Sequence, residues 1–378
     1  MATLEPLATQ LVNYTSHKRD HSGGDKSKHS VSYTLSRTQA VVVEYEKDEH
    51  TDMFQIGRSS ETPIDFVVTD TLPGSQRVPG QTQVAQSTIS RFSCRICVER
   101  SPPYTARIYA AGFDQHNHIF LGEKASKWYN QRDEIDGLTT NGVLLTHPRG
   151  QFAGKDCRPG KWREVSVRGG IYSLRETRSV PSKSQKVDSE SNILMDGTLI
   201  DLCGATLIWR SQKGLEQAPQ IHQLEEYIEQ INAARPQCPV GLTTLMLPKR
   251  SDKIDKSRQP YVYLACGHVH GSHSWKGDQN STTRTCPMCL KEGPFVQVQV
   301  GRETSIYTDT HPLTHIFTPC AHLTSEKTAR YWSSVVIPYG CQGFRAMCPY
   351  CATYLSPMDS ATKANGYIKL IFQDNTEF

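Results

Sequence analysis

A doubled pattern of cysteine and histidine in the C-terminal third constrains the fold of this 378-residue chain more than any other feature. Each copy is a Cys-x-His pair followed by a Cys-Pro-x-Cys pair, with 17 residues between the pairs in the first copy and 25 in the second. Zinc prefers thiolate and imidazole ligands, and a Cys-x2-Cys turn brings two sulfur atoms to one ion. The pattern therefore predicts two closed Cys3His sites, which leave no position for a reactive water and favour structural over hydrolytic zinc. The eight predicted ligands are Cys266, His268, Cys286, Cys289, Cys320, His322, Cys348 and Cys351.

Two pairings of these ligands are compatible with the spacing. Either each copy binds its own ion, or the pairs interleave in a cross-brace in which the first and third pairs share one ion. Nearby residues compete for these roles, because His270 and His273 follow the first pair closely, whereas Cys238 and Cys341 each lack a partner at ligand spacing. We expect these four to be ordinary buried or surface side chains rather than ligands.

The cysteines are unevenly distributed, and eight of the 12 follow residue 237. No apolar run approaches the roughly 20 residues that a membrane-spanning helix needs, and the first residues lack the apolar core of a secretory leader. In a reducing compartment, clustered thiols hold metal more often than they form disulfides. These features favour a cytoplasmic zinc protein with no membrane partner.

The region before the doubled pattern is rich in short β-type segments. Residues 1–29 are polar and aperiodic and are expected to be disordered. Short β-rich runs separated by Gly, Pro, Asn and Asp then recur through residues 31–210, which favours an antiparallel β-sandwich. Two interruptions, residues 73–86 and 115–137, are expected to be loop insertions on this sandwich. The chain is thus predicted to be mainly β.

A helix is predicted between the sandwich and the cysteine-rich region. Ile221, Leu224, Ile228 and Ile231 recur at helical spacing, and Pro236 ends the pattern. The expected organisation is a disordered segment 1–29, a sandwich domain 30–212, a connecting helix 213–236 and a small α+β zinc domain 237–378.

Basic residues are concentrated in one stretch. The formal net charge is +4, and residues 155–187 alone contain nine basic and three acidic side chains, an excess of +6. A short basic stretch beside a nearly neutral remainder suits a partner with a few negative charges better than a long polyanion. The simpler interpretation is a solvated basic loop. No nucleic-acid partner is expected.

Several motifs resemble known signalling modules. The Cys-Gly-His and Cys-Pro-x-Cys pairs look like the second half of a RING finger, whose usual partner is a ubiquitin-conjugating enzyme. Residues 54–59 (FQIGRS), 87–91 (STISR) and 139–142 (TTNG) resemble, in order, the three loop motifs of forkhead-associated domains. Together with residues 65–71 and 200–207, this order of modules is similar to the Pellino family over nearly the whole chain from about residue 30.

The resemblance implies a forkhead-associated β-sandwich with an inserted appendage, a RING-like zinc domain with two zinc ions, and ubiquitin ligation. The implied partners are a ubiquitin-conjugating enzyme carrying ubiquitin and phosphorylated Pelle/IRAK-type kinases of Toll and interleukin-1 receptor signalling. Phosphothreonine carries nearly two negative charges, so its pocket needs a charged fork and hydroxyl donors on converging loops. The implied pocket residues are Arg58, Ser90, Arg91, Thr140 and Asn141.

In a RING-type reaction the ligase supplies no nucleophile and acts by positioning its partners. By the same resemblance, Pro287 and Pro349 occupy the places that contact the conjugating enzyme. The chain departs from the family patterns at two points. Ser93 stands where many forkhead-associated domains have a histidine, and Leu290 and Ala352 stand where many active RING domains have an arginine. The missing arginine supports a second hypothesis, a non-catalytic phosphopeptide-binding scaffold in the same pathway.

Overall fold

The computed structural model describes residues 3–6, 28–36, 39–46, 50–69, 88–115, 118–122, 124–130, 134–248, 256–273, 275, 283–339, 343–355 and 366–373. Strands dominate these residues, as predicted. No helix among them combines the length and the apolar composition needed to cross a membrane.

Two sheets form the N-terminal β-sandwich. The six-stranded sheet has the order β1-β15-β14-β11-β12-β13, and the four-stranded sheet has the order β5-β4-β6-β7. Side chains of both sheets share one apolar core, which confirms the sandwich. In β7, for example, Ala106, Ile108 and Ala110 are buried and alternate with partly exposed residues, as a strand with one face on the core requires. The strand bounds are β1 Thr3–Pro6, β4 Thr51–Gly57, β5 Phe66–Val67, β6 Cys94–Glu99, β7 Ala106–Ala110, β11 Leu144–Thr146, β12 Arg163–Val165, β13 Ile171–Tyr172, β14 Thr198–Asp201 and β15 Thr206–Arg210.

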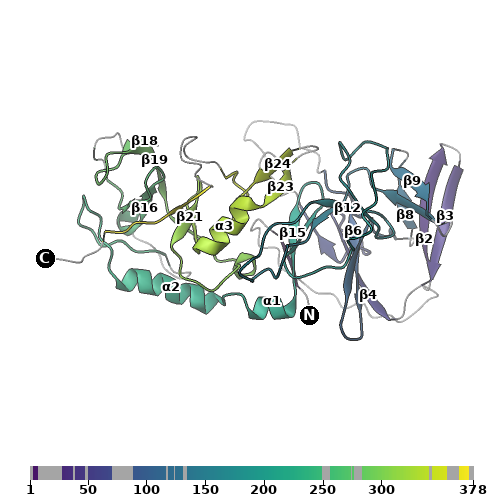
Figure 1. Ribbon diagram of the computed structural model, residues 1–378, viewed down its shortest axis with the longest axis horizontal. Helices are drawn as coiled ribbons and strands as arrows, with labels where there is room; N and C mark the ends of the chain where they lie inside the picture. Colours follow the sequence, from purple (N-terminus) through teal and green to yellow (C-terminus); the bar gives the residue numbers. More distant parts are fainter. Residues whose placement is uncertain are drawn as a thin grey trace.

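An appendage of further strands extends the sandwich at the end farthest from the C-terminal domain (Figure 1). It consists of a three-stranded sheet of order β3-β2-β8 and the hairpin β9-β10. Its strands are β2 Lys28–Ser36, β3 Gln39–Glu46, β8 His118–Leu121, β9 Ser126–Tyr129 and β10 Ile135–Leu138. The prediction that residues 115–137 form a loop is therefore wrong in part. Ile119, Phe120 and Leu121 do form one of the predicted β-rich runs, but their pairing was not predictable, because β2 pairs with β8 in parallel, Val31 opposite Ile119, and no local pattern reveals such a distant partner. Residues 73–86 lie outside the described residues.

The N-terminal segment also departs from its prediction. Residues 1–29 were expected to be disordered, yet Thr3–Pro6 forms β1 and pairs antiparallel with β15, with Leu4 opposite Trp209. β15 would otherwise leave an unpaired edge of backbone donors and acceptors, which favours an added strand even from a polar sequence. Lys28 and His29 already belong to β2.

Two helices follow the sandwich. The short α1 (Gln212–Glu216) begins at Ser211, whose side chain accepts a hydrogen bond from the Gly214 N–H. The longer α2 (Ile221–Ala233) has the predicted helical spacing, and Leu224 and Ile228 are its buried residues. The connecting segment 213–236 is not one helix as predicted, because residues 217–220 separate α1 from α2. Pro236 lies just beyond its end, as expected for a residue that cannot continue a helix.

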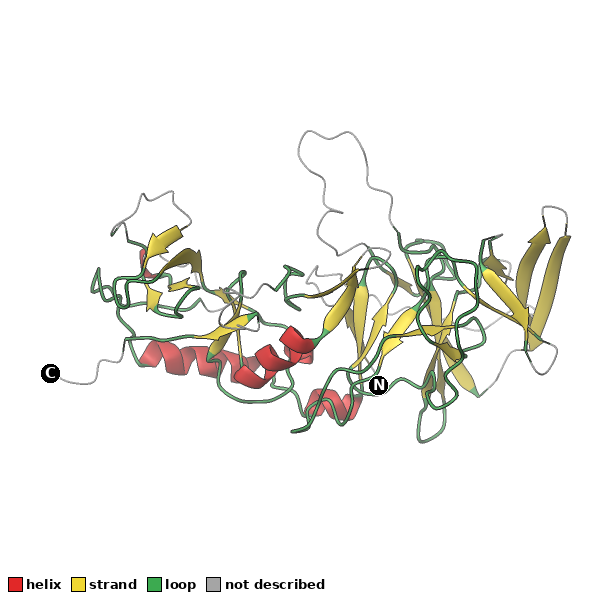
Figure 2. Cartoon of the chain, turned by 45° about the horizontal axis from the view of Figure 1, so that its top comes forward, coloured by secondary structure: helices red, strands yellow, loops and turns green. Residues whose placement is uncertain are grey.

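The C-terminal domain consists of two small β units. The first has the sheet order β17-β16-β19-β18, and the second has the order β20-β22-β21-β25 with helix α3 against it. The elements are η1 Lys256–Arg258, β16 Tyr261–Tyr263, β17 Val269–His270, β18 Thr283–Thr285, β19 Glu292–Gln297, β20 Gln299–Val300, η2 Thr304–Ile306, β21 His315–Phe317, β22 His322–Thr324, α3 Glu326–Ser334, β23 Val336–Tyr339, β24 Gly343–Ala346 and β25 Tyr367–Lys369. Figure 2 shows α2 running alongside both units.

The two units are tied together by exchanged backbone contacts. The C-terminal segment returns to the first unit, where Ile371 exchanges backbone hydrogen bonds with Gly267 and Val269. Only Val298 separates β19 of the first sheet from β20 of the second, where the Gln299 N–H donates to the Ala321 carbonyl. The units therefore form one α+β domain rather than two independent knuckles.

Candidate functional site

Two groups of residues are assembled by this fold. One is a surface made by three loops of the sandwich, residues 58–61, 88–91 and 139–142, called here the three-loop surface. The other is a pair of Cys/His clusters in the C-terminal domain. They are described in turn.

The first loop of the three-loop surface leaves β4 through Gly57. A Cβ atom at this position would lie 1.9 Å from the backbone oxygen of Arg91, so only glycine permits the two loops to approach. The next residue, Arg58, is exposed, and its Nε donates a hydrogen bond of 2.8 Å to the carbonyl of Ile89. Its backbone N–H donates to the carbonyl of Ser90 at 3.1 Å. The first two loops are thus held together at the base of the predicted phosphate fork.

The third loop is joined to the second by Asn141. Its Nδ2 donates to the backbone oxygen of Thr88 at 2.7 Å and to the Ser90 Oγ at 3.1 Å. Gly142 has a φ of +68°, and its N–H donates to the Thr139 carbonyl, which closes the turn on which Thr140 and Asn141 lie. The structure therefore brings the three predicted loops, and the five predicted residues on them, into one neighbourhood.

Ser93 does not replace the histidine by a side-chain contact of the same kind. Its backbone N–H donates to the Ile56 carbonyl at 2.8 Å, and its carbonyl accepts from the Ala111 N–H. The buried Gln55 side chain supports the first loop instead, because its Nε2 donates to the Pro63 carbonyl at 2.8 Å. Backbone pairing and one buried amide thus support these loops.

Two buried arginines hold the third loop from behind, and sequence analysis did not identify this role. Arg178 Nη1 lies 3.2 Å from the carbonyl oxygen of Asn141, and its Nη2 pairs with the buried carboxylate of Asp201. Arg175 Nη2 donates to the Thr139 carbonyl at 2.8 Å and to Glu164 Oε1 at 2.5 Å.

Both ion pairs are shielded from solvent. Burial is the largest single influence on the pKa of Arg178 and acts to lower it, but the charges of Asp201, Cys203 and Glu164 and the hydrogen bond to Asp201 together outweigh burial, so the pKa is raised. Burial raises the pKa of Glu164, and the hydrogen bonds from Arg175 offset part of that rise. Breaking either pair would leave a charge buried without a partner, which is strongly destabilising.

These contacts change the interpretation of the basic stretch 155–187. Four of its five arginines, at positions 163, 168, 175 and 178, pair with Glu190, Glu134, Glu164 and Asp201, respectively. Neither a partner surface nor a solvated loop describes them, because their charge is neutralised inside the sandwich domain. Charge counting along the sequence missed this because the acidic partners lie 11 to 34 residues away, outside the stretch except for Glu164.

Arg91, one of the predicted pocket residues, is already engaged by an acid. Its guanidinium pairs with Glu61, and it lies over the Phe92 ring at 5.5 Å. An incoming phosphate would have to compete with Glu61 for this cation.

Glu61→Gln is therefore expected to increase the affinity for a phosphothreonine peptide. An exposed ion pair is worth about 0.2–1 kcal/mol, so removing the competitor corresponds to about a 1.5- to 5-fold lower Kd. Fluorescence anisotropy with a labelled phosphopeptide would measure it, with Asp52→Asn as control, since Asp52 pairs with Arg100 on the same sandwich. A higher Kd for Glu61→Gln would contradict the competition.

The eight predicted ligands form two clusters of four. The first cluster contains Cys266, His268, Cys286 and Cys289, and the second contains Cys320, His322, Cys348 and Cys351. Within each cluster the possible ligand atoms all lie within 4.8 Å of one another. This decides the pairing that the spacing left open, because each copy of the pattern closes on itself and no cross-brace forms.

The two clusters are built by equivalent turns. The N–H groups of Gly267 and Ala321 donate to the carbonyls of Tyr263 and Phe317, each four residues earlier. The second pairs are equally alike. Cys286 N–H donates to Lys291 O and Leu290 N–H to Cys286 O, and the same bonds recur with Cys348, Thr353 and Ala352. Leu290 and Ala352 both have positive φ, at 59° and 54°.

The donor geometry fits a tetrahedral metal ion. A zinc ion with bonds of about 2.3 Å to sulfur and about 2.0 Å to nitrogen separates those atoms by about 3.6 Å. In the first cluster, His268 Nδ1 lies 3.2 Å from Cys266 Sγ and 3.6 Å from Cys286 Sγ. In the second, His322 Nδ1 is buried and has no hydrogen-bond partner among the described residues.

The thiols of each cluster are unequal. Burial raises the pKa of Cys286 and of Cys348. Burial also opposes ionisation of Cys289, but hydrogen bonds from the Lys291 N–H and from neighbouring thiols outweigh it, so that its pKa is lowered. Hydrogen bonds from Cys320 and Cys348 lower the pKa of Cys351. Crowded thiols of this kind ionise together only when a cation replaces their protons.

The competing residues lie outside the clusters. His270 is fully buried, and its Nε2 is 3.9 Å from Cys286 Sγ, behind the first cluster. His273 contacts the Tyr263 hydroxyl, and the buried Cys238 accepts a hydrogen bond from the Gly241 N–H. Cys341 lies outside the described residues. None of the other described cysteines is in a disulfide.

Comparisons with known proteins match both domains. A family model of the Pellino FHA domain matches residues 7–227, and a model of the Pellino RING domain matches residues 231–377. "Protein pellino" of Drosophila melanogaster is 58% identical over 353 residues, which cover 93% of this chain and 81% of that protein. "E3 ubiquitin-protein ligase pellino homolog 2" of Homo sapiens is 55% identical, covering 92% and 82%. The human homolog 3 is 52% identical, covering 92% and 73%.

Proposed function

Since this chain belongs to the Pellino family, we propose that its forkhead-associated domain selects phosphothreonine-containing proteins for its own RING domain to modify. The chain is a RING-type ubiquitin-protein ligase, and it works with a ubiquitin-conjugating enzyme. The proposed substrates are phosphorylated Pelle/IRAK-type kinases in Toll and interleukin-1 receptor signalling, and the proposed location is the cytoplasm.

The convergence of three loops supports the phosphothreonine proposal most directly. Arg58 provides a charged fork, Ser90 provides a hydroxyl, and Asn141 bridges the second and third loops by hydrogen bonds of 2.7 and 3.1 Å. These groups suit a phosphate with three acceptor oxygens beside a peptide main chain. Thr140 and Arg91 complete the proposed pocket, the latter after release from Glu61.

Modification of a kinase in two phosphorylation states tests the proposal. The purified chain, a conjugating enzyme and ubiquitin would be mixed with the phosphorylated kinase or with the same kinase after phosphatase treatment. Faster ubiquitination of the phosphorylated form is expected. Equal rates for both forms would contradict phosphate-directed selection without bearing on the ligase activity itself.

We propose that each Cys/His cluster holds one Zn²⁺ ion. Bound zinc would supply a rigid cross-link between the Cys-x-His turn and the Cys-Pro-x-Cys turn. Because four protein donors close each cluster, the ion has a structural role rather than a hydrolytic one. The chemistry of ubiquitin transfer then depends on positioning, since the conjugating enzyme brings the thioester and the substrate brings the lysine amine.

The two Cys-Pro-x-Cys turns differ in exposure, and this favours one of them for docking. In the first turn Met288 and Leu290 are 50% and 66% exposed and flank Cys289. In the second turn Pro349 is buried, and Tyr350 stacks on His322 at 5.3 Å. Pro349, predicted as a second docking residue, is therefore inaccessible, because the second unit packs its own core around that turn. The proposed docking surface consists of Pro287, Met288 and Leu290.

Leu290→Asp and Met288→Asp are expected to slow discharge of ubiquitin from a charged conjugating enzyme by about tenfold or more. Each variant would bury a charge against an apolar partner surface, which is costly without a counter-charge. Aspartate tolerates the positive φ of Leu290, so the turn is preserved.

Single-turnover discharge to free lysine is the measurement for these two variants, with zinc content determined in parallel. Phe344→Asp is the matched control, because Phe344 is an exposed apolar residue of the second unit. A normal discharge rate in both variants, or an equal loss in the control, would remove the first turn as the docking surface.

A further inference from the structure

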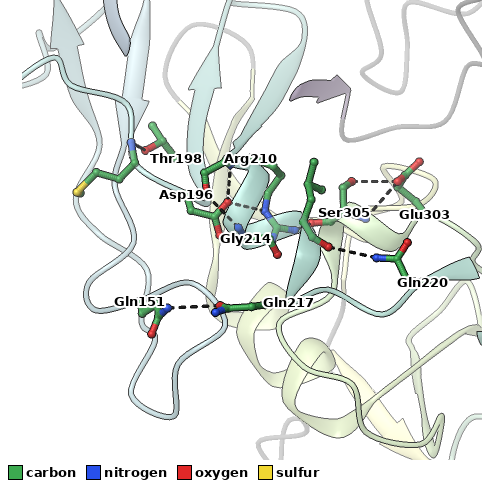
Figure 3. A network of polar contacts seen from close by, with 12 residues as sticks. Gln151, Asp196, Thr198, Arg210, Gly214, Gln217, Gln220, Glu303 and Ser305 are labelled. Atoms are coloured by element: carbon green, nitrogen blue, oxygen red, sulfur yellow. Dashed lines mark hydrogen bonds and ion pairs between the residues drawn. The ribbon is translucent and has the colours of Figure 1, made fainter. Parts of the chain in front are cut away.

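The connection between the two domains is a buried polar lock rather than a free tether. Arg210 ends β15 and is fully buried. Its Nε donates to Asp196 Oδ1 at 2.9 Å and its Nη2 to the Gly214 carbonyl at 2.8 Å, while its Nη1 donates to the carbonyl of Ser305 in the C-terminal domain (Figure 3). One guanidinium thus joins the sandwich, helix α1 and the second unit.

The surroundings of Arg210 leave it little freedom. Its guanidinium lies over the Phe152 ring at 4.7 Å, and Asp196 Oδ1 also accepts the Ser211 N–H at 2.8 Å. A Cβ atom at Gly214 would lie 2.1 Å from Asp196, so helix α1 packs directly on this carboxylate. Separating the domains would deprive a buried cation of one acceptor, which opposes opening.

Two further side chains cross the same interface. Trp162 of the sandwich domain donates from its indole Nε1 to the Val336 carbonyl at 2.6 Å. In the reverse direction, Lys327 of α3 donates from Nζ to the carbonyls of Ala153 and Thr308, both at 2.9 Å. These bonds join segments 174 residues apart in the sequence.

An apolar core continues across the interface. Phe152 packs edge to face on Tyr331 of α3, with ring centroids 5.4 Å apart. A single cluster of buried residues includes Leu199 and Ile208 of the sandwich together with Trp332 of α3. Domains joined by small polar interfaces move relative to one another, whereas a shared apolar core with buried hydrogen bonds suppresses such motion.

We propose that Arg210, Trp162 and Lys327 lock the two domains into one rigid body, so that ubiquitin reaches only lysines within a defined span of the bound phosphothreonine. The restriction on substrate lysines rests on the proposed function, whereas the lock between the two domains does not. A rigid body holds the three-loop surface and the turn at Met288 at a fixed separation and orientation. The effective concentration of ubiquitin at a substrate lysine is then highest when the distance from that lysine to the phosphothreonine matches this fixed separation.

The double variant Trp162→Phe, Lys327→Met tests the lock. It removes the hydrogen bonds that Trp162 and Lys327 donate across the interface, and it keeps an aromatic ring at position 162. The matched control is Trp128→Phe, Lys213→Met, because Trp128 lies in the appendage and Lys213 on the exposed side of α1.

Small-angle X-ray scattering and calorimetry on the full, zinc-loaded chain report the coupling between the two domains without any ligand. We expect one unfolding transition and a compact scattering profile for the parent and control, and two transitions with a larger radius of gyration for the double variant. Two transitions already in the parent chain would overturn the lock.

A substrate series tests the consequence. Each substrate carries one phosphothreonine and one lysine, separated by a Gly/Ser linker of increasing length. The parent should modify one range of linker lengths about tenfold or more faster than the rest, and the double variant should lose this optimum.

Phosphopeptide affinity and discharge to free lysine should be unchanged in both, because none of the substituted residues lies in either site. A flat dependence on linker length in a parent that binds the peptide and discharges ubiquitin would refute the proposed span. If the parent fails to bind phosphopeptide, the proposed function fails, and scattering and calorimetry still decide the lock.

Discussion

Cys286→Ala and Cys348→Ala are each expected to release one zinc ion and to unfold the C-terminal domain. Both thiols are fully buried within their clusters, and each supplies one of four donors. Structural zinc contributes on the order of 10 kcal/mol or more in small domains, which is comparable to the whole stability of a typical domain. No other described cysteine lies close enough to either cluster to replace the lost donor.

Zinc content by mass spectrometry and unfolding by circular dichroism are the measurements for these variants. The parent chain should bind two ions, and each variant at most one. Cys97→Ala is the control, because this partly exposed thiol lies on β6 of the sandwich, away from both clusters. If either cluster variant retains two ions and the parental midpoint of unfolding, the assigned ligands are wrong.

Arg58→Ala is expected to abolish most of the affinity for a phosphothreonine peptide while leaving ubiquitin-chain assembly intact. A hydrogen bond between charged partners is worth about 1.5–3 kcal/mol, and its loss corresponds to about a 10- to 150-fold higher Kd. Arg58 also bridges the first two loops through Ile89, so part of the loss would come from a less ordered pocket. Chain assembly depends on the C-terminal domain, whereas Arg58 lies in a loop of the sandwich domain.

Isothermal titration with phosphorylated and unphosphorylated forms of one peptide measures the effect. Arg58→Lys should recover only part of the affinity, because an ammonium group lacks the planar fork of arginine. Arg100→Ala is the matched control, since this exposed arginine pairs with Asp52 on the same sandwich. Equal phosphopeptide affinity in Arg58→Ala and the parent would refute the pocket assignment.

Local sequence patterns identified the chemistry of this protein better than its architecture. The Cys-x-His and Cys-Pro-x-Cys pairs were recognisable because short turns set ligand spacing within a few residues. The helix at Ile221–Ala233 and the three pocket loops were recognisable for the same reason. In each case the signal lies within one turn or one element.

Long-range pairing decided what local patterns left open. The parallel pairing of β2 with β8 turned a predicted loop insertion into a sheet. Arg175 and Arg178 of the basic stretch 155–187 became internal support for the third pocket loop, since they pair with the buried carboxylates of Glu164 and Asp201. Neither result depends on a spacing that the sequence displays.

The sequence by itself determined which eight side chains are the candidate metal ligands and which three loops are the candidate phosphate-binding loops, because these depend on side-chain chemistry at short separations. Only the tertiary structure decided that each repeat closes on its own cluster, that the turn at Met288 is exposed while the turn at Tyr350 is buried, and that Arg210 joins the two domains. These outcomes depend on burial and on contacts between residues far apart in the chain. Burial is a property of the packed molecule, so two turns of nearly identical sequence can differ in it completely.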